Sequence, residues 1–384
     1  MIPRANSTRC ARLSADRLSA PSPEHERAMD HKEDRLDLMK TTTLVATLAA
    51  FALAGAGCKG GGEAAVQLDT TQLALYGPLP DVMESPANPI SETKIELGRK
   101  LYFETRLSMA NDLSCSSCHR LDAYGADTGA VSIGHQGKRG GRNSPTVYNA
   151  AGHVAQFWDG RAADVEAQAL GPILNPVEMA MPAAPAVIGR VRADAEYRRL
   201  FAAAFPGERN PVTYENLGRA IGAFERRLVT PARWDQALRG ADSVLTNAEK
   251  AGFNTFTSTG CPMCHLGVYI GGSIYQKTGL VTPWPDTTDV GREAVTHQPS
   301  DRFVFKVPSL RNIEHTAPYF HNGAVRSLDT AVVMMAHHQL GRTLTPEQVT
   351  SIVTWLRSLT GRIPTEYIAR PDLRPITSSA HTTP

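Results

Sequence analysis

The chain has 384 residues, of which 42% are hydrophobic and 20% are charged, and its formal net charge at pH 7 is +2. This length and composition suit a globular protein of two ordinary domains. Because the net charge is close to zero, nothing in the electrostatics supports nucleic-acid binding, and we exclude nucleic acid as a partner.

The N-terminus joins a polar stretch to a short apolar one. Residues 1–38 show no apolar period, and we interpret them as a non-native or disordered extension ahead of the native start, for which Met39 is the more natural residue. A genuine cytosolic extension is the alternative. The run from Leu44 to Ala56 has about the length of a signal-peptide core and is too short to span a bilayer. Residues 39–58 therefore predict an export signal and a periplasmic location.

Cys58 closes this segment and is a candidate for lipid attachment. The small residues before it suit such a site, but Gly55 stands three positions upstream, where leucine is usual. Lipid anchoring through Cys58 and simple cleavage both stay open. Residues 59–80 include the glycine run 60–62 and are predicted to form a flexible linker.

Two amphipathic helices are predicted in the first half of the chain. Ser91 can cap a helix that runs to about residue 103, and Thr213 can cap another over 214–228. Apolar residues recur at helical spacing in both. Gly98 lies on the first helix, where the missing side chain would let another helix approach closely.

Two Cys-x-x-Cys-His motifs carry the strongest chemical signal. In this spacing two thiols attach a c-type haem covalently, and the adjacent histidine becomes the proximal ligand of the iron. A zinc half-site or a redox disulfide is the alternative for each cysteine pair, but neither requires the histidine. The cofactor-binding residues are Cys115, Cys118 and His119 in the first motif and Cys261, Cys264 and His265 in the second.

The second half repeats the helix plan of the first. Thr246 and Glu249 form a capping-box signature ahead of a helix that carries Gly252. The second haem motif follows. Thr345 then precedes a last helix with Pro346 in its first turn and an apolar stripe along one face.

This repeated order is the plan of class I cytochromes c, in which a helix, the haem motif and a crossing helix follow one another. We therefore expect a mainly α fold with two such domains, each with one covalently attached haem. The boundaries expected are 81–230 for an N-terminal haem domain, 231–370 for a C-terminal haem domain, and 371–384 for a tail.

Further phrases lie between and after the motifs. Together with the haem motifs they closely resemble the bacterial dihaem cytochrome c peroxidases, a family that also contains MauG-like enzymes, over about residues 80–365. The phrases are Ser132-Ile-Gly-His135, Arg142-Asn143-Ser-Pro-Thr146, Phe157-Trp158-Asp-Gly-Arg161, Asn175-Pro-Val-Glu178-Met179, Leu310-Arg-Asn312 and Thr316-Ala-Pro-Tyr-Phe-His321.

The resemblance implies that the first haem is the peroxidatic one, with His119 as its proximal ligand. His135 matches the distal histidine that occupies the iron at rest in some members and leaves on activation. The glycine-rich loop 134–141 suits a segment that must move. Glu178 matches the catalytic glutamate, whose task is to move a proton from the inner to the outer oxygen of peroxide.

The resemblance further implies that the second haem accepts electrons at high potential. His265 would be its proximal ligand and Met335 its thioether sixth ligand, which raises the potential. Met334 is a neighbouring competitor, and His337 and His338 are further candidates. MauG-like members use a tyrosine at this position, so methionine favours a peroxidase.

Two other features are implied by the resemblance alone. Trp158 matches a tryptophan between the haems that offers a route for electrons. Asn143, with the backbone carbonyls of Thr316 and Pro318, matches a calcium site between the domains, and ligands that are all oxygen suit calcium.

The resemblance as a whole implies a periplasmic enzyme that reduces hydrogen peroxide to water with electrons from a small cytochrome c or a cupredoxin. It also implies a homodimer. A MauG-like oxidase acting on a protein or small molecule, and a dihaem electron carrier without enzyme activity, are the two alternatives.

Overall fold

The structure is a computed structural model, and it describes residues 65–373. The predicted extension, the export signal, Cys58 and most of the tail lie outside this range. The described residues belong to one compact unit, Glu63–Pro384. Within the described range no helix is long and apolar enough to cross a membrane.

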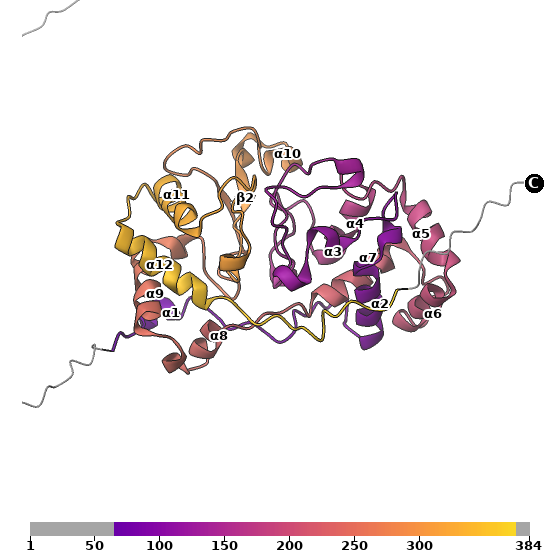
Figure 1. Cartoon of the computed structure of the whole chain (residues 1–384), viewed down its shortest axis with the longest axis horizontal. Helices are drawn as coiled ribbons and strands as arrows, with labels where there is room; N and C mark the ends of the chain where they lie inside the picture. The colour runs from indigo at the N-terminus through magenta and orange to yellow at the C-terminus, as the bar shows by residue number, and fades with distance from the viewer. Residues whose placement is uncertain (1–64, 374–384) are drawn as a thin grey trace, which may run out of the picture. The chain divides into compact units, whose positions relative to one another are not determined.

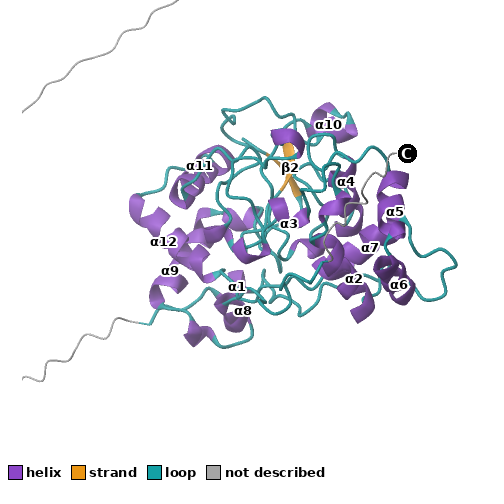
Figure 2. Ribbon diagram, turned by 45° about the vertical axis from the view of Figure 1, so that its right-hand side comes forward, coloured by secondary structure: helices purple, strands orange, loops and turns teal. Residues whose placement is uncertain are grey.

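The prediction of a mainly helical fold is confirmed (Figure 2). In the described part of the chain, one two-stranded antiparallel sheet pairs β1, Tyr275–Lys277, with β2, Val304–Lys306. Long loops and short 3-10 turns fill the space between the helices. The helices are α1 Thr70–Leu73, α2 Glu92–Tyr102, α3 Cys115–Cys118, α4 Val165–Leu174, α5 Ala184–Ala193, α6 Ala195–Ala204, α7 Tyr214–Glu225, α8 Arg233–Leu238, α9 Asn247–Thr259, α10 Glu293–Thr296, α11 Leu328–Leu340 and α12 Pro346–Ser358.

The four predicted helix starts are found as expected. The side chains of Ser91, Thr213, Thr246 and Thr345 each accept a hydrogen bond from a backbone N–H in the first turn of α2, α7, α9 and α12. Helix α7 ends at Glu225, before the predicted end at residue 228. The reason is that the N–H groups of residues 227 and 228 bond to the carbonyls three positions back, so the last turn tightens.

Each half contains a close helix crossing built on a glycine. A Cβ atom at Gly98 of α2 would stand 1.9 Å from the carbonyl oxygen of Ala220 in α7. A Cβ atom at Gly252 of α9 would stand 2.1 Å from the carbonyl oxygen of Ser351 in α12. Both glycines are therefore required by the contact between backbones, as the sequence led us to expect.

The buried apolar residues form two principal clusters. The first lies within residues 95–228 and fills the space between α2, α4, α5, α6 and α7. The second lies mainly within residues 232–359 and centres on Trp234, Phe253 and Trp355. The assignment of one haem domain to each cluster, with a boundary near residue 230, remains a prediction.

The prediction of a flexible linker over 59–80 is wrong for the described part of that segment. Leu68 and Tyr76 are buried in the second cluster, and Leu79 is buried beside them in a smaller one. The apolar side chains of this segment pack against the buried clusters. The prediction relied on the glycines at 60–62 and gave too little weight to these side chains. It crosses from α1 toward α2 in Figure 1.

The C-terminal segment packs against the first half of the molecule. Ile363, Tyr367 and Ile368 contact the first cluster, although the sequence placed them in the C-terminal domain. The hydroxyl of Tyr367 donates to the carbonyl of Phe224 in α7 at 2.7 Å. Each half of the molecule is therefore covered by a segment from the far end of the chain (Figure 1).

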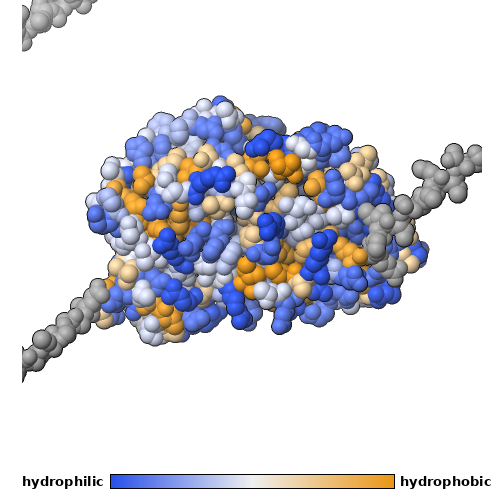
Figure 3. Space-filling view, viewed as in Figure 1, coloured by the Kyte–Doolittle hydropathy of each residue, from blue (hydrophilic) through white to orange (hydrophobic). Residues whose placement is uncertain are grey.

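The exterior in Figure 3 is mainly hydrophilic, with apolar residues in separate patches. Met263 is the most exposed of the large apolar side chains in the described range, at 68%. It lies between the two cysteines of the second haem motif, so part of this motif reaches the surface.

Candidate functional site: two haem-binding halves

The first haem motif presents its histidine in a defined tautomer. His119 follows α3, and its Nδ1 lies 3.3 Å from the carbonyl oxygen of Gly125. Burial lowers the pKa of His119, so the ring is neutral and Nδ1–H donates to that carbonyl. The other nitrogen, Nε2, is thereby left with the lone pair that an iron ligand needs.

The second motif repeats this arrangement. Nδ1 of His265 lies 3.4 Å from the carbonyl oxygen of Ile270, and burial lowers the pKa of His265 to about 4. A tyrosine hydroxyl holds the histidine backbone in each half. Tyr102 donates to the carbonyl of His119 at 2.7 Å, and Tyr76 donates to the carbonyl of His265 at 3.2 Å.

The cysteines complete a set that fits c-type haem. Cys115, Cys118, Cys261 and Cys264 are free and half-buried. Burial raises the pKa of Cys261 to about 12. Each pair of thiols stands directly before an oriented histidine, which covalent haem attachment requires and a zinc half-site does not.

The second motif opens into a cavity with an apolar lining that also contains Met335. Cys261, Cys264 and His265 line it together with Met335 of α11, whereas Met334 is not part of the lining. His337 is exposed, and Nδ1 of His338 faces the carbonyl oxygen of Thr282 at 3.1 Å. Of the four candidates on α11, Met335 is the one that shares the cavity with the proximal histidine.

The loop with His135 is docked against the segment that contains Glu178. The backbone N–H of His135 is shared between the carbonyls of Val177 and Glu178, at 3.0 and 2.8 Å. A Cβ atom at Gly134 would stand 2.1 Å from the carbonyl oxygen of Val177, so only glycine permits this approach. At Gly137 and Gly141 a side chain would meet nothing. Gly134 thus serves docking, Gly137 adopts a positive φ of 75° that favours glycine, and Gly141 lies in open space.

Nδ1 of His135 is buried and makes no hydrogen bond with any residue in the described range. Such a group costs free energy unless a partner satisfies it. The structure therefore brings His135 and Glu178 together, and it leaves a histidine nitrogen without a protein partner at that place.

Glu178 lines a second cavity with Asn175, Arg161 and Phe157. Nδ2 of Asn175 donates to its Oε1 at 2.9 Å. Burial raises the pKa of Glu178, and the hydrogen bond and the charge of Arg161 only partly oppose that rise. A half-buried carboxyl with a raised pKa holds a proton more readily than an exposed one, which suits a group that takes up and releases protons.

Trp158 lies at the junction of the two halves. Its Nε1–H donates to the carbonyl of Asn143 at 2.9 Å, and its ring meets the ring of His321 edge to face at 6.3 Å. It lines the cavity of the second haem motif, and its neighbour Phe157 lines both cavities. Phe157, with Trp158 beside it, therefore forms the wall between the cavity of the second haem motif and the cavity of Glu178.

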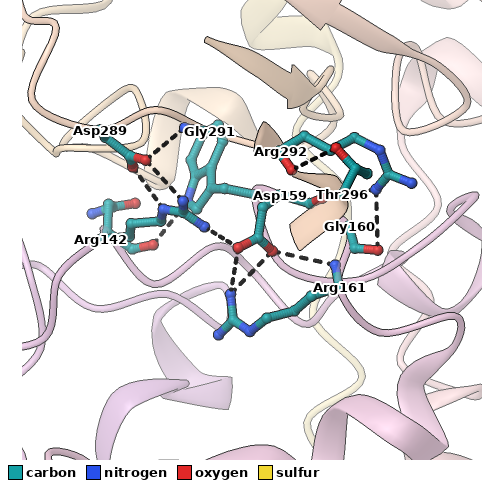
Figure 4. Close-up of polar contacts among 10 residues, drawn as sticks. Arg142, Asp159, Gly160, Arg161, Asp289, Gly291, Arg292 and Thr296 are labelled. Atoms are coloured by element: carbon teal, nitrogen blue, oxygen red, sulfur yellow. Dashed lines mark hydrogen bonds and ion pairs between the residues drawn. The ribbon is translucent and has the colours of Figure 1, made fainter. Parts of the chain in front are cut away.

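Ion pairs join the halves beside this wall (Figure 4). Arg142 donates to both oxygens of Asp289 at 2.7 and 2.8 Å and to Asp159 at 2.5 Å. Asp159 also accepts from Arg161, and its carbonyl accepts from Arg292 at 2.9 Å. The planar forks of the arginines fix the angles between the segments that they join.

Three of the five arginine and aspartate residues of this network, Arg142, Asp159 and Arg161, were present in the sequence phrases but received no role there. Arg161 is the clearest omission, because it lies over the Phe157 ring at 3.5 Å and faces the cavity of Glu178. A charged residue in a run of apolar and small residues was the available signal.

The candidate calcium residues line one cavity. Asn143, Thr316 and Pro318 all belong to the cavity of the second motif. Asn143 is buried, and its Nδ2 donates to the carbonyls of Gly129 and Ala130 at 3.3 Å. That orientation reserves Oδ1 for another partner. Among residues 65–373 no cluster of three or more His, Cys, Asp or Glu side chains offers an alternative metal site.

Comparison with known proteins places these features in a family. A profile described as Di-haem cytochrome c peroxidase matches residues 92–243. The chain is 44% identical to the cytochrome c551 peroxidase of Pseudomonas aeruginosa over 320 residues, which is 81% of this chain and 90% of that protein. It is 33% identical to the methylamine utilization protein MauG of Methylorubrum extorquens, over 72% of this chain and 78% of that one.

Among solved structures, a MauG-like protein associated with microbial copper homeostasis superposes with a TM-score of 0.67 at 29% identity and covers 76% of this chain and 97% of that chain. The family and its diheme members agree with the two haem-binding sets described above. The chain belongs to the di-haem cytochrome c peroxidase family.

Proposed function

We propose that this protein is a dihaem cytochrome c peroxidase that reduces hydrogen peroxide to water with electrons from a small cytochrome c or a cupredoxin. The peroxidase relatives at 39–44% identity support an oxidoreductase of this kind. When bound, the two haem irons supply the electron transfer and the site at which peroxide is reduced.

The observation that carries the proposal is the surroundings of Glu178. Reduction of peroxide needs a group that takes a proton from one oxygen and delivers it to the other, because water is then the leaving group. Asn175 holds the carboxyl in place, and burial gives it the raised pKa that such a shuttle needs. Its neighbours at the backbone are the residues of the His135 loop.

The His135 loop has the features of a gate. Two backbone hydrogen bonds from one N–H hold it against residues 177 and 178, and Gly137 and Gly141 leave it room to change conformation. We propose that His135 excludes peroxide when it occupies the first site, and that its release exposes Glu178.

Electrons enter, in this proposal, through the second half. Met263 brings the second motif to the surface, where a donor protein can approach. Met335 shares the cavity of His265 and supplies a thioether, which favours a high potential. Trp158 and Phe157 then form the wall across which electrons pass to the first half.

The chief alternative is a MauG-like oxidase, because MauG proteins are also relatives at 31–33% identity. Met335 favours the peroxidase, because MauG-like members of the family that this sequence resembles carry a tyrosine at the matching position. A dihaem electron carrier is the other alternative, and it gives no reason for a buried glutamate beside a glycine-rich histidine loop.

Three further parts of the proposal rest on the sequence. The apolar run after Met39 supports export to the periplasm, with lipid attachment at Cys58 still open. The oxygen atoms of Asn143, Thr316 and Pro318 support a calcium site, which would tie the halves together. A homodimer is proposed from the resemblance alone.

A steady-state assay tests the proposal. The haem-loaded protein is mixed with hydrogen peroxide and a reduced small cytochrome c or cupredoxin, and donor oxidation is followed by absorbance. We expect two donor molecules to be oxidised for each peroxide consumed. Absence of peroxide-dependent donor oxidation, together with oxidation of a protein or small molecule by the same preparation, would favour the MauG-like alternative.

A further inference from the structure

Lys306, on β2 of the second half, is a buried lysine without an acidic partner. Only 8% of the residue is exposed, and among residues 65–373 no carboxylate forms an ion pair with it. Burial alone lowers the pKa of Lys306 to about 8. A buried ammonium group is costly unless a negative charge lies close to it.

The hydrogen bonds of Lys306 leave one of its donors free. Its Nζ donates to the carbonyl of Ala155 at 2.8 Å and lies 3.3 Å from Nδ1 of His153. An ammonium group has three N–H donors and no acceptor. Two donors are satisfied by these protein atoms, and the third needs a partner.

The contact with Lys306 also fixes the tautomer of His153. Because the ammonium group can only donate, Nδ1 of His153 must accept, and the ring proton then sits on Nε2. Burial and the charge of Lys306 lower the pKa of His153 well below its ordinary value, so the ring is neutral. Nε2 is buried and makes no hydrogen bond with any described residue. The pair therefore offers two unsatisfied donors, one charged and one neutral.

Both side chains line the cavity that contains the second haem motif. Lys306 and His153 share it with Cys261, His265 and Met335. The chemistry that two adjacent N–H donors, one of them cationic, recognise best is a carboxylate. A c-type haem carries two propionate carboxylates, and the rest of the cavity supplies the groups that attach and ligate the haem.

We propose that Lys306 and His153 bind a propionate of the second haem, with Lys306 as the counter-charge and His153 Nε2 as a second donor. Lys306 also donates its backbone N–H to the carbonyl of Trp158 at 2.8 Å. The anchored carboxylate is therefore tied to the wall between the two halves. This role rests on the two haems of the proposed function and not on peroxide turnover.

The consequence of the pairing is a haem potential that resists changes in pH. The charge of Lys306 keeps the nearby carboxylate ionised and favours the reduced, less positive haem. Without that charge, the buried carboxylate would take up a proton when the haem is reduced, and the potential would become pH-dependent in the neutral range.

The test compares Lys306→Gln with Lys277→Gln, which changes an exposed lysine on the neighbouring strand β1. Haem content is checked first, and the midpoint potential of the second haem is then followed by spectroelectrochemical titration across neutral pH, without peroxide. We expect Lys306→Gln to lower the potential and to introduce a pH dependence, while Lys277→Gln matches the unmodified protein. A haem-loaded Lys306→Gln protein with the unmodified potential at every pH would overturn the proposal.

A second pair of variants decides the question if Lys306→Gln does not take up haem. His153→Leu removes the neutral donor and keeps the lysine, and His153→Gln restores a donor. The propionate bending band in the resonance Raman spectrum reports hydrogen bonding to the carboxylate. We expect it to move to lower frequency in His153→Leu and to return in His153→Gln. No movement in His153→Leu would contradict the proposal. Because none of these readouts involves peroxide, failure here is distinct from failure of the peroxidase assignment.

Discussion

The two haem-binding halves share one arrangement of helices around the haem motif and differ in the other residues of the site. In each, two helices cross at a glycine, the histidine of the motif donates through Nδ1 to a carbonyl, and a tyrosine hydroxyl holds its backbone. The tyrosine of the first half belongs to α2 itself. The tyrosine of the second half comes from the N-terminal segment, so the second site depends on residues far from it in sequence.

The difference lies in the further site residues assigned to each half, of which Met335 shares a cavity with His265. Met335 sits within the regular helix α11, where its position is fixed by the helix. His135 and Glu178 sit on loops that hold each other through backbone hydrogen bonds. A permanent ligand for electron transfer suits a helix, whereas groups that must release a ligand and move a proton suit loops.

The largest expected effect is a loss of peroxide turnover when Glu178, in the first half, is changed. Glu178→Gln removes the proton shuttle, and we expect peroxide turnover to fall roughly 10²–10⁴-fold. The spectra of both haems should stay unchanged, because Glu178 belongs to neither haem motif. Glu215→Gln on the exposed side of α7 is the matched control. Full activity in Glu178→Gln would remove the role assigned to this carboxyl.

The next effect compares how much one buried ion pair in each half contributes to the free energy of unfolding. Arg311 and Asp235 form an ion pair at 2.9 Å with side chains 1% and 0% exposed, and Asp235 also accepts from the backbone of the N-terminal segment at Leu79. Arg311→Met leaves a buried carboxylate without its counter-charge, and we expect it to cost about 3–5 kcal/mol in urea unfolding.

The counterpart in the first half is less buried. Arg226 pairs with Glu166 at 2.7 Å, with side chains 6% and 13% exposed, and Asn88 also donates to Glu166. Arg226→Met should therefore destabilise less than Arg311→Met. Equal losses for the two variants would show that burial does not distinguish the pairs.

A smaller effect should be common to both halves. Gly98→Ala and Gly252→Ala place a methyl group against a backbone carbonyl, and we expect each to cost about 1–3 kcal/mol. Gly189→Ala in α5 is the control, because a Cβ atom there meets nothing within 4 Å. It should stabilise by about 0.5–1 kcal/mol, since glycine is a poor helix former. Thermal unfolding distinguishes the two outcomes, and equal behaviour of all three glycines would contradict the crossing geometry.

The smallest effect concerns the pH dependence of the first half. Glu178 acts as a base in its carboxylate form, so turnover falls as the pH drops through its raised pKa. The charge of Arg161 holds that pKa down against burial. Arg161→Gln should therefore raise the pKa and move the acid limb of the rate profile to higher pH, whereas the exposed Arg120→Gln should not. An acid limb at the same pH in Arg161→Gln would show that its charge does not reach Glu178.

The sequence predicted the elements with strong local signals. The caps at Ser91, Thr213, Thr246 and Thr345 determine where helices start, and a cap depends only on residues within one turn. The crossing glycines were also predictable, because the same spacing recurs around both haem motifs.

What the sequence did not predict depends on contacts between distant segments. Residues 65–80 pack on the second half and residues 363–373 on the first half. A local sequence pattern shows that a side chain is apolar, but it does not show which of the two clusters that side chain joins. Of the two polar neighbours of Glu178, Asn175 could be predicted from the sequence because it is three residues away. Arg161 could not, because it comes from another loop. Nothing in the local sequence indicates a role for Lys306, because its partners Ala155 and His153 come from a distant segment.

The central claim is that electrons enter at the Met335 half and peroxide is reduced at the Glu178 half. The most direct test is steady-state peroxide reduction by the haem-loaded protein, with reduced cytochrome c, before and after prior one-electron reduction of the second haem. We expect turnover only after reduction, and turnover in both cases for His135→Gly, in which the gate is absent. Activity of the unmodified protein in both states would remove the gate alone. No turnover in either state, with intact haem spectra and a competent donor, would contradict the account.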